Sequence, residues 1–537
     1  MSLSNEALRR ALYGAAATMA LVALGSGQAF AAEGDASGAP DADALRAQVR
    51  QLSALVQSLS QHDQEQIQAL SDQVKTLQSR LDQATTATPR AAQGVEGGPV
   101  LQAQSGAAAD SQSALPRVVQ NSSKHFALQS PDGQYSIGFT GGFQFDTGDY
   151  VNFHPASKLS GPQALSAGEN ARRARFGVAG TAFGDWGYAF VYDAGNSQDT
   201  TPKGIQTAQL VYGGLKGAAF EIGYSNTFFT LDQSTSGYDT LFLERASPSD
   251  IATSLNTGDS RANAGARFFG DRYWVGGYLT GPASGDSHTL IAERFGAFER
   301  VAVQALKGPD YSLHLGVGVD ELLQAPNTGN GTANAISLST QPELRIDPTT
   351  FLNTGTVGTL ANPVTGAYVL NVESAATFRN LFWQGEYYHY QIDRQALPRA
   401  DFDGGYGQVS WTITGENHKY NPQAGAYYRI VPTKSFSLAS GQWGAWELAA
   451  RVSYVDLNSN FVQTKALTTQ PAAIDGGLQR SYTFGINWYP NEIVRLLLDY
   501  NHVDYEKDNG VVTKGLALGA PVGAQFDAVS LRVQVVY

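Results

Sequence analysis

Arginine side chains lie an even number of residues apart in two segments of this chain. Successive side chains of a β-strand point to opposite faces, so residues two apart share a face. Arg173 and Arg175 therefore share one face, and Arg261 shares a face with Asn263 and Arg267. A guanidinium group keeps its charge and offers a planar fork of donors, which suits it to replace part of the water around an anion. The chemistry expected of such a row is the binding or passage of anions.

The same parity adds three arginines from later segments. Arg451, Arg495 and Arg532 each lie between apolar neighbours in the chain, so in a strand they occupy the face opposite to those neighbours. We expect these faces to point inward and to line a pore with Arg173, Arg175, Arg261, Asn263, Arg267, Arg451, Arg495 and Arg532. Glu447 and Asp499 fall on the same faces. An alternative therefore stays open, in which the arginines pair with inward acids and loop carboxylates and brace the wall.

No catalytic or metal-binding motif accompanies these arginines. The chain has no Cys, which excludes disulfides and thiolate metal sites, and its 8 His form no HExxH motif. No glycine-rich phosphate loop precedes a helix, and no convincing Ser-His-Asp set emerges. We therefore expect no enzyme activity, no catalytic residue, no metal and no cofactor. The formal net charge of −12 argues against a nucleic-acid partner.

The element that must carry these side chains is a strand with one apolar and one polar face. The C-terminal segment has this pattern, because Arg532 and Gln534 alternate with Leu531, Val533, Val535 and Tyr537. A transmembrane β-barrel is built from such strands, since one face meets lipid and the other a water-filled lumen. After the N-terminus the chain has no uncharged apolar run of the ~20 residues that a spanning helix needs. The composition, with 58 Gly, 25 Phe and 25 Tyr, also favours an all-β transmembrane barrel.

Connections that alternate between tight and long separate the strands expected from about Arg117 to Tyr537. The expected tight turns are 184–185, 215–217, 270–272, 307–310, 379–380, 415–423 and 490–491. The expected long loops are 148–170, 195–204, 226–259, 281–290, 321–366, 394–401, 458–477 and 505–524. Together these connections join about sixteen antiparallel strands, an even number as in bacterial outer-membrane barrels. Ile336 to Arg345 is an alternative strand within the longest loop.

The N-terminal region divides into three parts. Residues 1–31 have a positive start, a short apolar run and an Ala-Phe-Ala site, so we expect a signal peptide, with a membrane anchor as the alternative. Residues 32–83 carry apolar residues at heptad spacing, which predicts an α-helical coiled coil in the periplasm. Dimer and trimer both fit this pattern, and a helix lying against another surface is the alternative. Residues 84–116 have the composition of a flexible linker, and 117–537 form the barrel domain.

Short segments of the barrel region resemble the phosphate-selective porin O and P family. They include 126–139, 172–177, 242–245, 384–387, 444–453 and 488–491. The resemblance implies a passive sixteen-stranded porin of the outer membrane, assembled as a homotrimer, whose third loop folds into the lumen. It also implies that in some members a ladder of inward arginines tunes the channel to phosphate. In this chain Asn263, Gly265, Glu447 and Asp499 interrupt such a ladder.

The third loop, 226–259, contains the two candidates for a constriction, Glu244 and Arg245. In the alternative, these two residues pin the loop to the wall. The first hypothesis for function is an outer-membrane porin that passes small hydrophilic solutes by diffusion, with a preference for anions or phosphate. The second is a structural protein, embedded in outer-membrane lipid, that tethers this membrane to the cell wall through the coiled coil. A hydrolase embedded in the barrel is a distant third.

Overall fold

The computed structural model describes residues 116–537, except 121–125, 197–203, 257, 284–290, 328, 330, 331 and 512–514. The expected signal peptide, the coiled coil and nearly all of the linker lie outside the described residues. The tethering hypothesis and the periplasmic position of the coiled coil depend on that segment, so they stay predictions.

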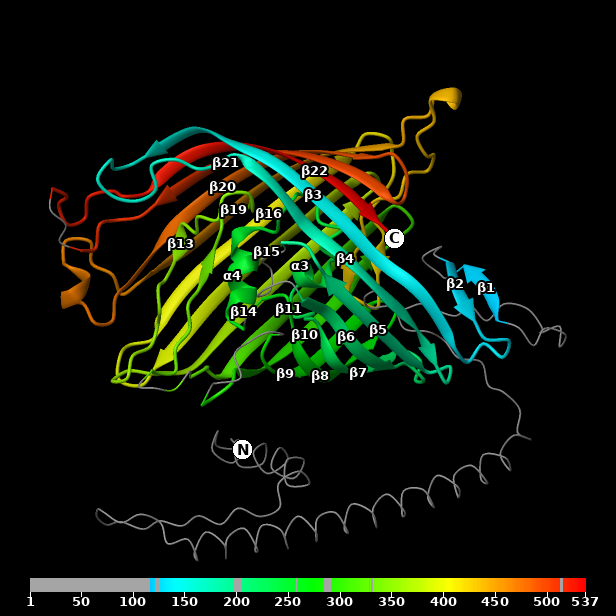
Figure 1. Cartoon of the computed structure of the whole chain (residues 1–537), viewed down its shortest axis with the longest axis horizontal. Coiled ribbons are helices and arrows are strands. Elements are labelled where there is room, and N and C mark those ends of the chain that lie inside the picture. The colour runs from blue at the N-terminus through cyan, green and yellow to red at the C-terminus, as the bar shows by residue number, and fades with distance from the viewer. Residues whose placement is uncertain are drawn as a thin grey trace, which may run out of the picture. The chain divides into compact units, whose positions relative to one another are not determined.

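Sixteen antiparallel strands form a closed barrel (Figure 1). They are β3 (Ser136–Pro155), β4 (Gly168–Ala182), β5 (Trp186–Asp193), β6 (Gly204–Tyr212), β7 (Ala218–Asn226), β8 (Ser260–Phe269), β9 (Tyr273–Thr280), β10 (Phe295–Lys307), β11 (Tyr311–Gln324), β14 (Val364–Phe378), β15 (Leu381–Arg394), β16 (Ala400–Thr412), β19 (Ala445–Ser459), β20 (Ile474–Tyr489), β21 (Val494–Glu506) and β22 (Ala524–Val536). Each strand pairs with the next, and β22 pairs with β3, which closes the sheet. The expected fold and strand number are confirmed.

The remaining elements precede the barrel or lie in its connections. They are β1 (Arg117–Gln120), β2 (Phe126–Gln129), α3 (Leu231–Ser234), α4 (Ser247–Ser254), β12 (Ser339–Thr340), β13 (Leu352–Asn353), β17 (Tyr420–Asn421), β18 (Ala426–Tyr427) and the 3-10 turns η1 (Leu438–Ser440) and η2 (Leu467–Thr469). β1 and β2 form a hairpin that extends the sheet from the first barrel strand. Among the described residues, no helix is both long and apolar enough to cross a membrane.

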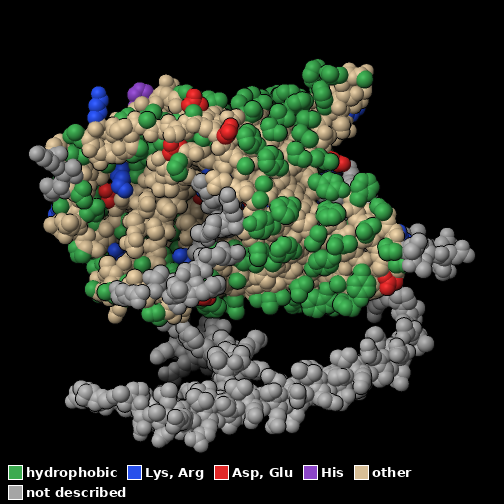
Figure 2. All heavy atoms as spheres, viewed as in Figure 1, with side chains coloured by type: hydrophobic (Ala, Val, Ile, Leu, Met, Phe, Trp, Pro, Cys, Tyr) green, Lys and Arg blue, Asp and Glu red, His purple; other side chains and the backbone are tan. Residues whose placement is uncertain are grey.

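The barrel wall has an apolar outer face and a polar inner face. In β22, Leu531 and Val533 are exposed, whereas Arg532 between them is completely buried. Hydrophobic side chains gather on the outer surface around β3 to β5 (Figure 2). A soluble protein places its apolar side chains inside, so this inverted pattern is typical of a barrel that sits in a membrane.

Six of the seven expected tight turns are confirmed, and one is wrong. The connection between β16 and β19 is not a tight turn at 415–423 but a segment of residues 413–444 that contains β17 and β18. The alternative strand at 336–345 is also wrong, because that part of the chain holds only the short strand β12, which pairs with β13.

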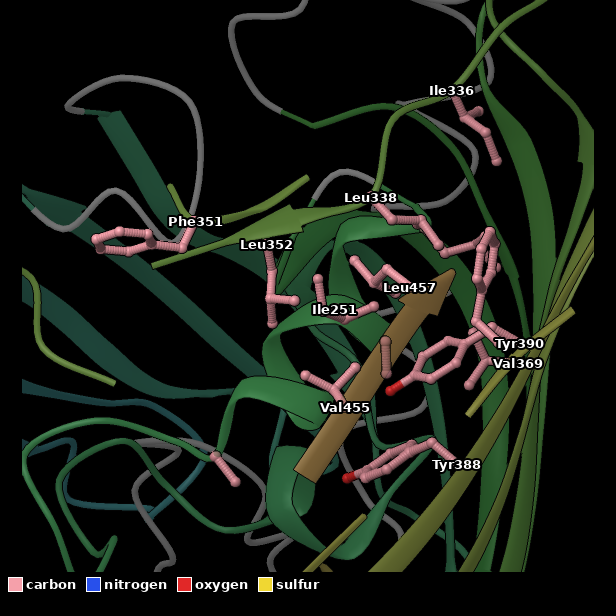
Figure 3. Close-up of a cluster of buried hydrophobic side chains, with 14 of the residues drawn as sticks. Ile251, Ile336, Leu338, Phe351, Leu352, Val369, Tyr388, Tyr390, Val455 and Leu457 are labelled. Carbon is pink, nitrogen blue, oxygen red and sulfur yellow. The ribbon is translucent and has the colours of Figure 1, made fainter. Parts of the chain in front are cut away.

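Three connections fold into the barrel and pack against its inner wall. They are the β7–β8 loop (227–259), the β11–β14 loop (325–363) and the part of the β16–β19 connection that contains β17 and β18. Ile251 of α4, Leu338 and Leu352 of the β11–β14 loop, and the wall residues Tyr388 and Val455 belong to one buried hydrophobic cluster (Figure 3). On the other side of the β7–β8 loop, Phe242 packs in a second cluster with Tyr427 of the β16–β19 connection. The β7–β8 loop is therefore held between the other two connections.

Candidate functional site

A β-bulge in β4 turns two consecutive arginines toward the interior. The register pairs Gln144 of β3 with Arg173, and Asp146 with Asn170, so β4 has one residue more than β3 in this interval. Arg172 and Arg173 are consequently both buried, although strict alternation would place them on opposite faces. Arg172 is a site residue that the sequence pattern missed, and parity alone carries no signal for a bulge.

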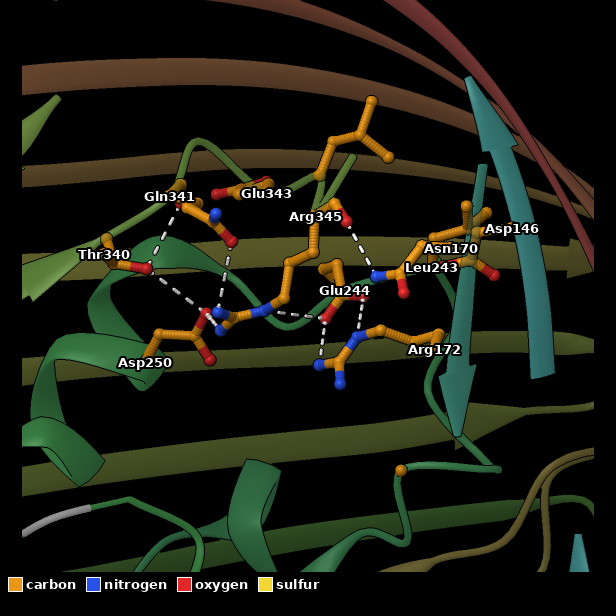
Figure 4. A network of polar contacts seen from close by, with 12 residues as sticks. Asp146, Asn170, Arg172, Leu243, Glu244, Asp250, Thr340, Gln341, Glu343 and Arg345 are labelled. Carbon is orange, nitrogen blue, oxygen red and sulfur yellow. Dashed lines mark hydrogen bonds and ion pairs between the residues drawn. The ribbon is translucent and has the colours of Figure 1, made fainter. Parts of the chain in front are cut away.

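Glu244 of the β7–β8 loop is bound by three arginines from three segments. Figure 4 shows two of them, Arg172 and Arg345. Arg172 of β4 holds it with a fork, with Nε 2.6 Å from Oε1 and Nη2 2.8 Å from Oε2. Nε of Arg345, from the β11–β14 loop, lies 3.4 Å from Oε2, and Nη2 of Arg532, from β22, lies 3.1 Å from Oε1. Burial raises the pKa of the Glu244 carboxyl, but the field of Arg172, Arg532 and Arg345 outweighs burial and lowers the pKa below 4.5. This carboxylate is therefore ionised at neutral pH.

Two further carboxylates complete the charge pattern around Glu244. Asp146 of β3 binds Arg532 through two contacts of 2.6 Å each. Asp250 of α4 binds Arg345 at 2.5 Å, and these two side chains are the most exposed members of the network, at 12% each. Guanidinium groups and carboxylates thus alternate from the wall to the loop surface.

The main chain around Glu244 has its own anchors on the wall. Asp499 of β21 accepts a hydrogen bond of 2.7 Å from the Leu243 amide, and Arg532 donates to the Leu243 carbonyl. Arg451 of β19 donates to the Glu244 carbonyl at 2.9 Å and binds the Glu343 carboxylate at 2.5 Å. Glu343 in turn accepts the Ser247 amide at 3.0 Å. The backbone on both sides of Glu244 is therefore fixed independently of its carboxylate.

The tip of the β7–β8 loop, residues 236–239, is a stretch of partly or fully exposed residues in a loop that is otherwise mostly buried. Arg495 of β21 donates to the Thr240 carbonyl at 2.8 Å, and Arg173 donates to Gln144 at 2.7 Å on the neighbouring strand. The guanidinium of Arg175 lies 5.8 Å from the centre of the Tyr238 ring and pairs with Asp193 at 2.9 Å. Arg495 thus meets Arg173 and Arg175 at one place, although it lies far from both in the sequence.

The arginines of β8 form a separate group. Arg261 pairs with Asp320 of β11 at 2.9 Å, and Arg267 pairs with Glu221 of β7 at 3.0 Å, all of them almost completely buried. Asn263 donates to the hydroxyl of Ser225 at 3.0 Å. These contacts are the ones expected in the alternative in which the arginines pair with inward acids and brace the wall.

Arg300 of β10 was missed by the sequence pattern. It binds Glu373 at 2.7 Å and donates to the carbonyls of Ala424 and Gly425 in the β16–β19 connection. Arg245, the second constriction candidate, is buried and binds within its own loop, to the carboxylate of Asp232 at 3.3 Å and to the Thr235 carbonyl at 3.0 Å. Its neighbour Glu244 contacts the wall directly. Glu244 therefore joins the loop to the wall, whereas Arg245 joins two parts of the loop to each other.

The predicted site residues are therefore buried or nearly so, and the structure gives each of them a polar partner. Their role in lining a pore stays a prediction. In the described part of the chain, no three His, Asp or Glu side chains are grouped so that they could hold a metal ion.

Comparison with known proteins assigns the family. A sequence profile described as phosphate-selective porin O and P matches residues 137–537. This chain belongs to the phosphate-selective porin O and P family. The chain is 22% identical to Porin O of Pseudomonas aeruginosa over 390 residues. This alignment covers 70% of this chain and 84% of Porin O. Over 458 residues the chain is 25% identical to an uncharacterized protein of Caulobacter vibrioides, covering 82% of this chain and 84% of that protein.

Among solved structures, OmpT, an outer membrane protein of Vibrio cholerae, is similar to this porin, with 13% identity and a TM-score of 0.44 over 75% of this chain and 99% of that one. Family and barrel together make the chain an outer-membrane porin, a channel protein. The third long connection of this porin lies inside the barrel, as the resemblance implied.

Proposed function

We propose that this porin passes small hydrophilic solutes by diffusion and favours anions over cations. The observation that carries the proposal is the gathering of four guanidinium groups around the loop tip at residues 236–239. Arg173, Arg175 and Arg495 reach it from the wall, and Arg429 reaches it from the β16–β19 connection by pairing with Asp239 at 2.6 Å. Asp193 pairs with Arg175, and Asp239 pairs with Arg429.

The physical reason is the weak screening inside a narrow protein channel. A charge near protein walls interacts with its neighbours about four times more strongly than in bulk water. Guanidinium groups that meet at this level therefore lower the energy of an anion there and raise that of a cation. The paired arginines of β8 contribute less, because Asp320 and Glu221 cancel their charges at contact distance.

The test is ion selectivity measured on the purified protein in planar bilayers. Wild type in a KCl gradient should give a reversal potential of the sign that indicates chloride permeation. Replacing both Arg173→Ala and Arg175→Ala should lower the anion-to-cation permeability ratio about tenfold, which corresponds to ~1.4 kcal/mol. Arg480→Ala is the matched control, because Arg480 lies on the outer face and pairs with Glu506. A cation-selective or unselective wild type would contradict the proposal.

We also propose that the porin assembles as a homotrimer, which is the assembly that the family resemblance implies. Native mass spectrometry of the detergent-solubilised protein should give the mass of three chains. A monomer as the dominant species under mild extraction would contradict this assembly.

A further inference from the structure

A polar pocket lies inside the barrel beside β15 and β16. Its lining comes from these two wall strands, from the β7–β8 loop and from the β16–β19 connection. The lining residues are buried, with the exception of Asp239, which belongs to the loop tip at residues 236–239. Asp239 therefore marks the opening of the pocket, at the level of the channel where the loop tip lies.

Two glutamines of the wall supply side-chain amides to this pocket. Gln384 of β15 and Gln408 of β16 are direct partners across the two strands, so their side chains lie next to each other on the inner face. Gln408 is 6% exposed, and its amide has no hydrogen-bond partner among the residues that the structure describes. Gln384 donates to the Tyr406 hydroxyl at 2.6 Å, but within the same part of the chain its amide oxygen accepts no hydrogen bond. Buried polar groups are normally hydrogen-bonded, so these free amide groups point to a ligand.

The β7–β8 loop adds hydrogen-bond acceptors to the pocket. Oδ1 of Asp232 pairs with Arg245 at 3.3 Å, whereas Oδ2 is buried without a hydrogen-bond partner in the described part of the chain. The hydroxyls of Thr235 and Thr240 each donate to a main-chain carbonyl at 3.0 Å, so they have only lone pairs left for a ligand. The loop side of the pocket therefore accepts hydrogen bonds, and the Gln408 amide both donates and accepts them.

The other charged groups of the lining also have partners of opposite charge or strong hydrogen bonds. Asp239 pairs with Arg429 at 2.6 Å, and the imidazole of His418 bonds to the Glu447 carboxylate at 2.7 Å. Both carboxylates of the lining are thus matched by a guanidinium group. The pocket accordingly offers a ligand hydrogen bonds and not a charge to neutralise.

We propose that this pocket binds the hydroxyl groups of an uncharged polyhydroxylated solute, a monosaccharide or another polyol. A hydroxyl group both donates and accepts, which is what Gln408, the Gln384 oxygen and Oδ2 of Asp232 together require. An ammonium group only donates, so it would leave the NH2 group of Gln408 without an acceptor. Chloride only accepts, so it would leave the free oxygens without a donor.

Aromatic side chains complete the lining. The rings of Phe382 and Tyr427 lie 5.2 Å apart between their centres and give the pocket an apolar surface beside the polar groups. Small-molecule sites in proteins commonly combine apolar surface with a few placed polar groups. The carbon skeleton of a polyol fits the first part of this surface and its hydroxyls fit the second.

The inference rests on the diffusion of small hydrophilic solutes proposed above, and it adds a class of uncharged solute. It does not depend on the preference for anions. A solute held in the pocket would occupy the channel beside the loop tip and reduce the flow of ions, and this makes binding measurable as a block.

The experiment measures the block of KCl current by D-glucose in single channels of the purified protein. Wild type should show a block that saturates with glucose concentration, after correction for the conductivity of each solution. Diglyme, an uncharged ether without a hydroxyl group, should give no saturable block.

Gln408→Met keeps most of the length of the side chain but removes its donor and its acceptor. It should raise the half-blocking glucose concentration about tenfold, because two hydrogen bonds to the solute are lost. Gln209→Met is the matched control, since Gln209 is a buried glutamine on the inner face of β6, away from the lining of the pocket, and it should leave the block unchanged. Neither substitution changes a charge, so the reversal potential in a KCl gradient should stay that of wild type. Heat-modifiable migration on a gel verifies that each barrel is folded.

The outcomes separate this inference from the proposed function. An anion-selective wild type without a saturable glucose block would overturn the inference and leave the proposed function in place. An unchanged half-blocking concentration in folded Gln408→Met would overturn it as well, and Gln384→Met decides by the same criterion if Gln408→Met does not fold. If wild type forms no channel, the proposed function fails. Binding of D-glucose to the folded protein in detergent, measured by saturation-transfer NMR on wild type and Gln408→Met, then decides the inference by itself.

Discussion

Replacing Arg532 with Met removes a guanidinium that joins two wall strands to the β7–β8 loop. The side chain is completely buried, binds both oxygens of Asp146 at 2.6 Å, and reaches Glu244 at 3.1 Å and the Leu243 carbonyl. Methionine keeps most of the length of the side chain but offers no donor. The substitution leaves the carboxylate of Asp146, which is 1% exposed, without its cation.

The expected loss of stability follows from that stranded charge. Removing one partner of a buried ion pair costs about 3–5 kcal/mol, because the other charge stays buried and unpaired. With ~1.4 kcal/mol for each factor of ten, this is two to four orders of magnitude in the unfolding equilibrium. The double variant Arg532→Met with Asp146→Leu should regain most of the loss, since no charge is then stranded between β3 and β22. Glu244 keeps its contacts with Arg172 and Arg345 in both variants.

The assay is reversible denaturant unfolding of the barrel refolded in lipid vesicles, followed by tryptophan fluorescence. Arg480→Met is the matched control, because the side chains of Arg480 and Glu506 are 38% and 57% exposed and such a pair contributes at most about 1 kcal/mol. The reasoning is refuted if Arg532→Met costs no more than Arg480→Met. It is also refuted if the double variant is as unstable as the sum of its two single variants.

Three further outcomes test other parts of the molecule. Gly425 and Gly441 both have positive φ (61° and 65°), but a Cβ at Gly425 would lie 3.1 Å from Trp274, whereas one at Gly441 would meet nothing within 4 Å. Gly425→Ala should therefore lower the free energy of unfolding by about 1–3 kcal/mol more than Gly441→Ala in the same titration, and equal losses would rule out tight packing at Gly425. The pKa of Glu244 is lowered from 4.5, so the contribution of this carboxylate to holding the loop is complete above pH 4.5 and is lost as the pH falls through the lowered folded-state pKa. Channel conductance should therefore stay constant from pH 7 to about 4.5 and change below it, and the same change in Glu244→Gln would exclude Glu244 as its cause. The Tyr390 hydroxyl donates to the Pro248 carbonyl at 2.7 Å, so Tyr390→Phe should lower the free energy of unfolding by about 1 kcal/mol and speed amide exchange in α4. The control Tyr387→Phe, on the outer face, should leave amide exchange in α4 unchanged.

The barrel itself was predictable because its signal is local. The period of two, the turn residues and the alternation of tight and long connections are all properties of neighbouring residues, and they led to the correct strand number and to the position of the last strand. The burial of Arg451, Arg495 and Arg532 followed from the same parity, because a regular strand has no other way to orient its side chains.

Parity failed where the backbone departs from regular geometry. The bulge in β4 depends on how β4 meets β3, so nothing in residues 170–173 distinguishes the inward Arg172 from an outward one. The prediction of a tight turn between β16 and β19 was wrong for a related reason. The Gly, Asn and Pro residues of this connection are typical of a short turn, whereas its inward position depends on partners such as Trp274 and Arg300 that lie more than a hundred residues earlier.

The sequence by itself determined a sixteen-stranded barrel with an apolar outer face and arginines on its inner face, because strand alternation and connection length are encoded residue by residue. Only the tertiary structure decided which charges meet. Glu244 lies 72, 101 and 288 residues from the arginines that bind it. The strength of an ion pair depends on distance and burial in space, and neither quantity can be read from separation along the chain. The arginines that the sequence presents as one row therefore differ in their partners. Arg261 and Arg267 pair with wall carboxylates, whereas Arg451, Arg495 and Arg532 also donate to main-chain carbonyls of the β7–β8 loop.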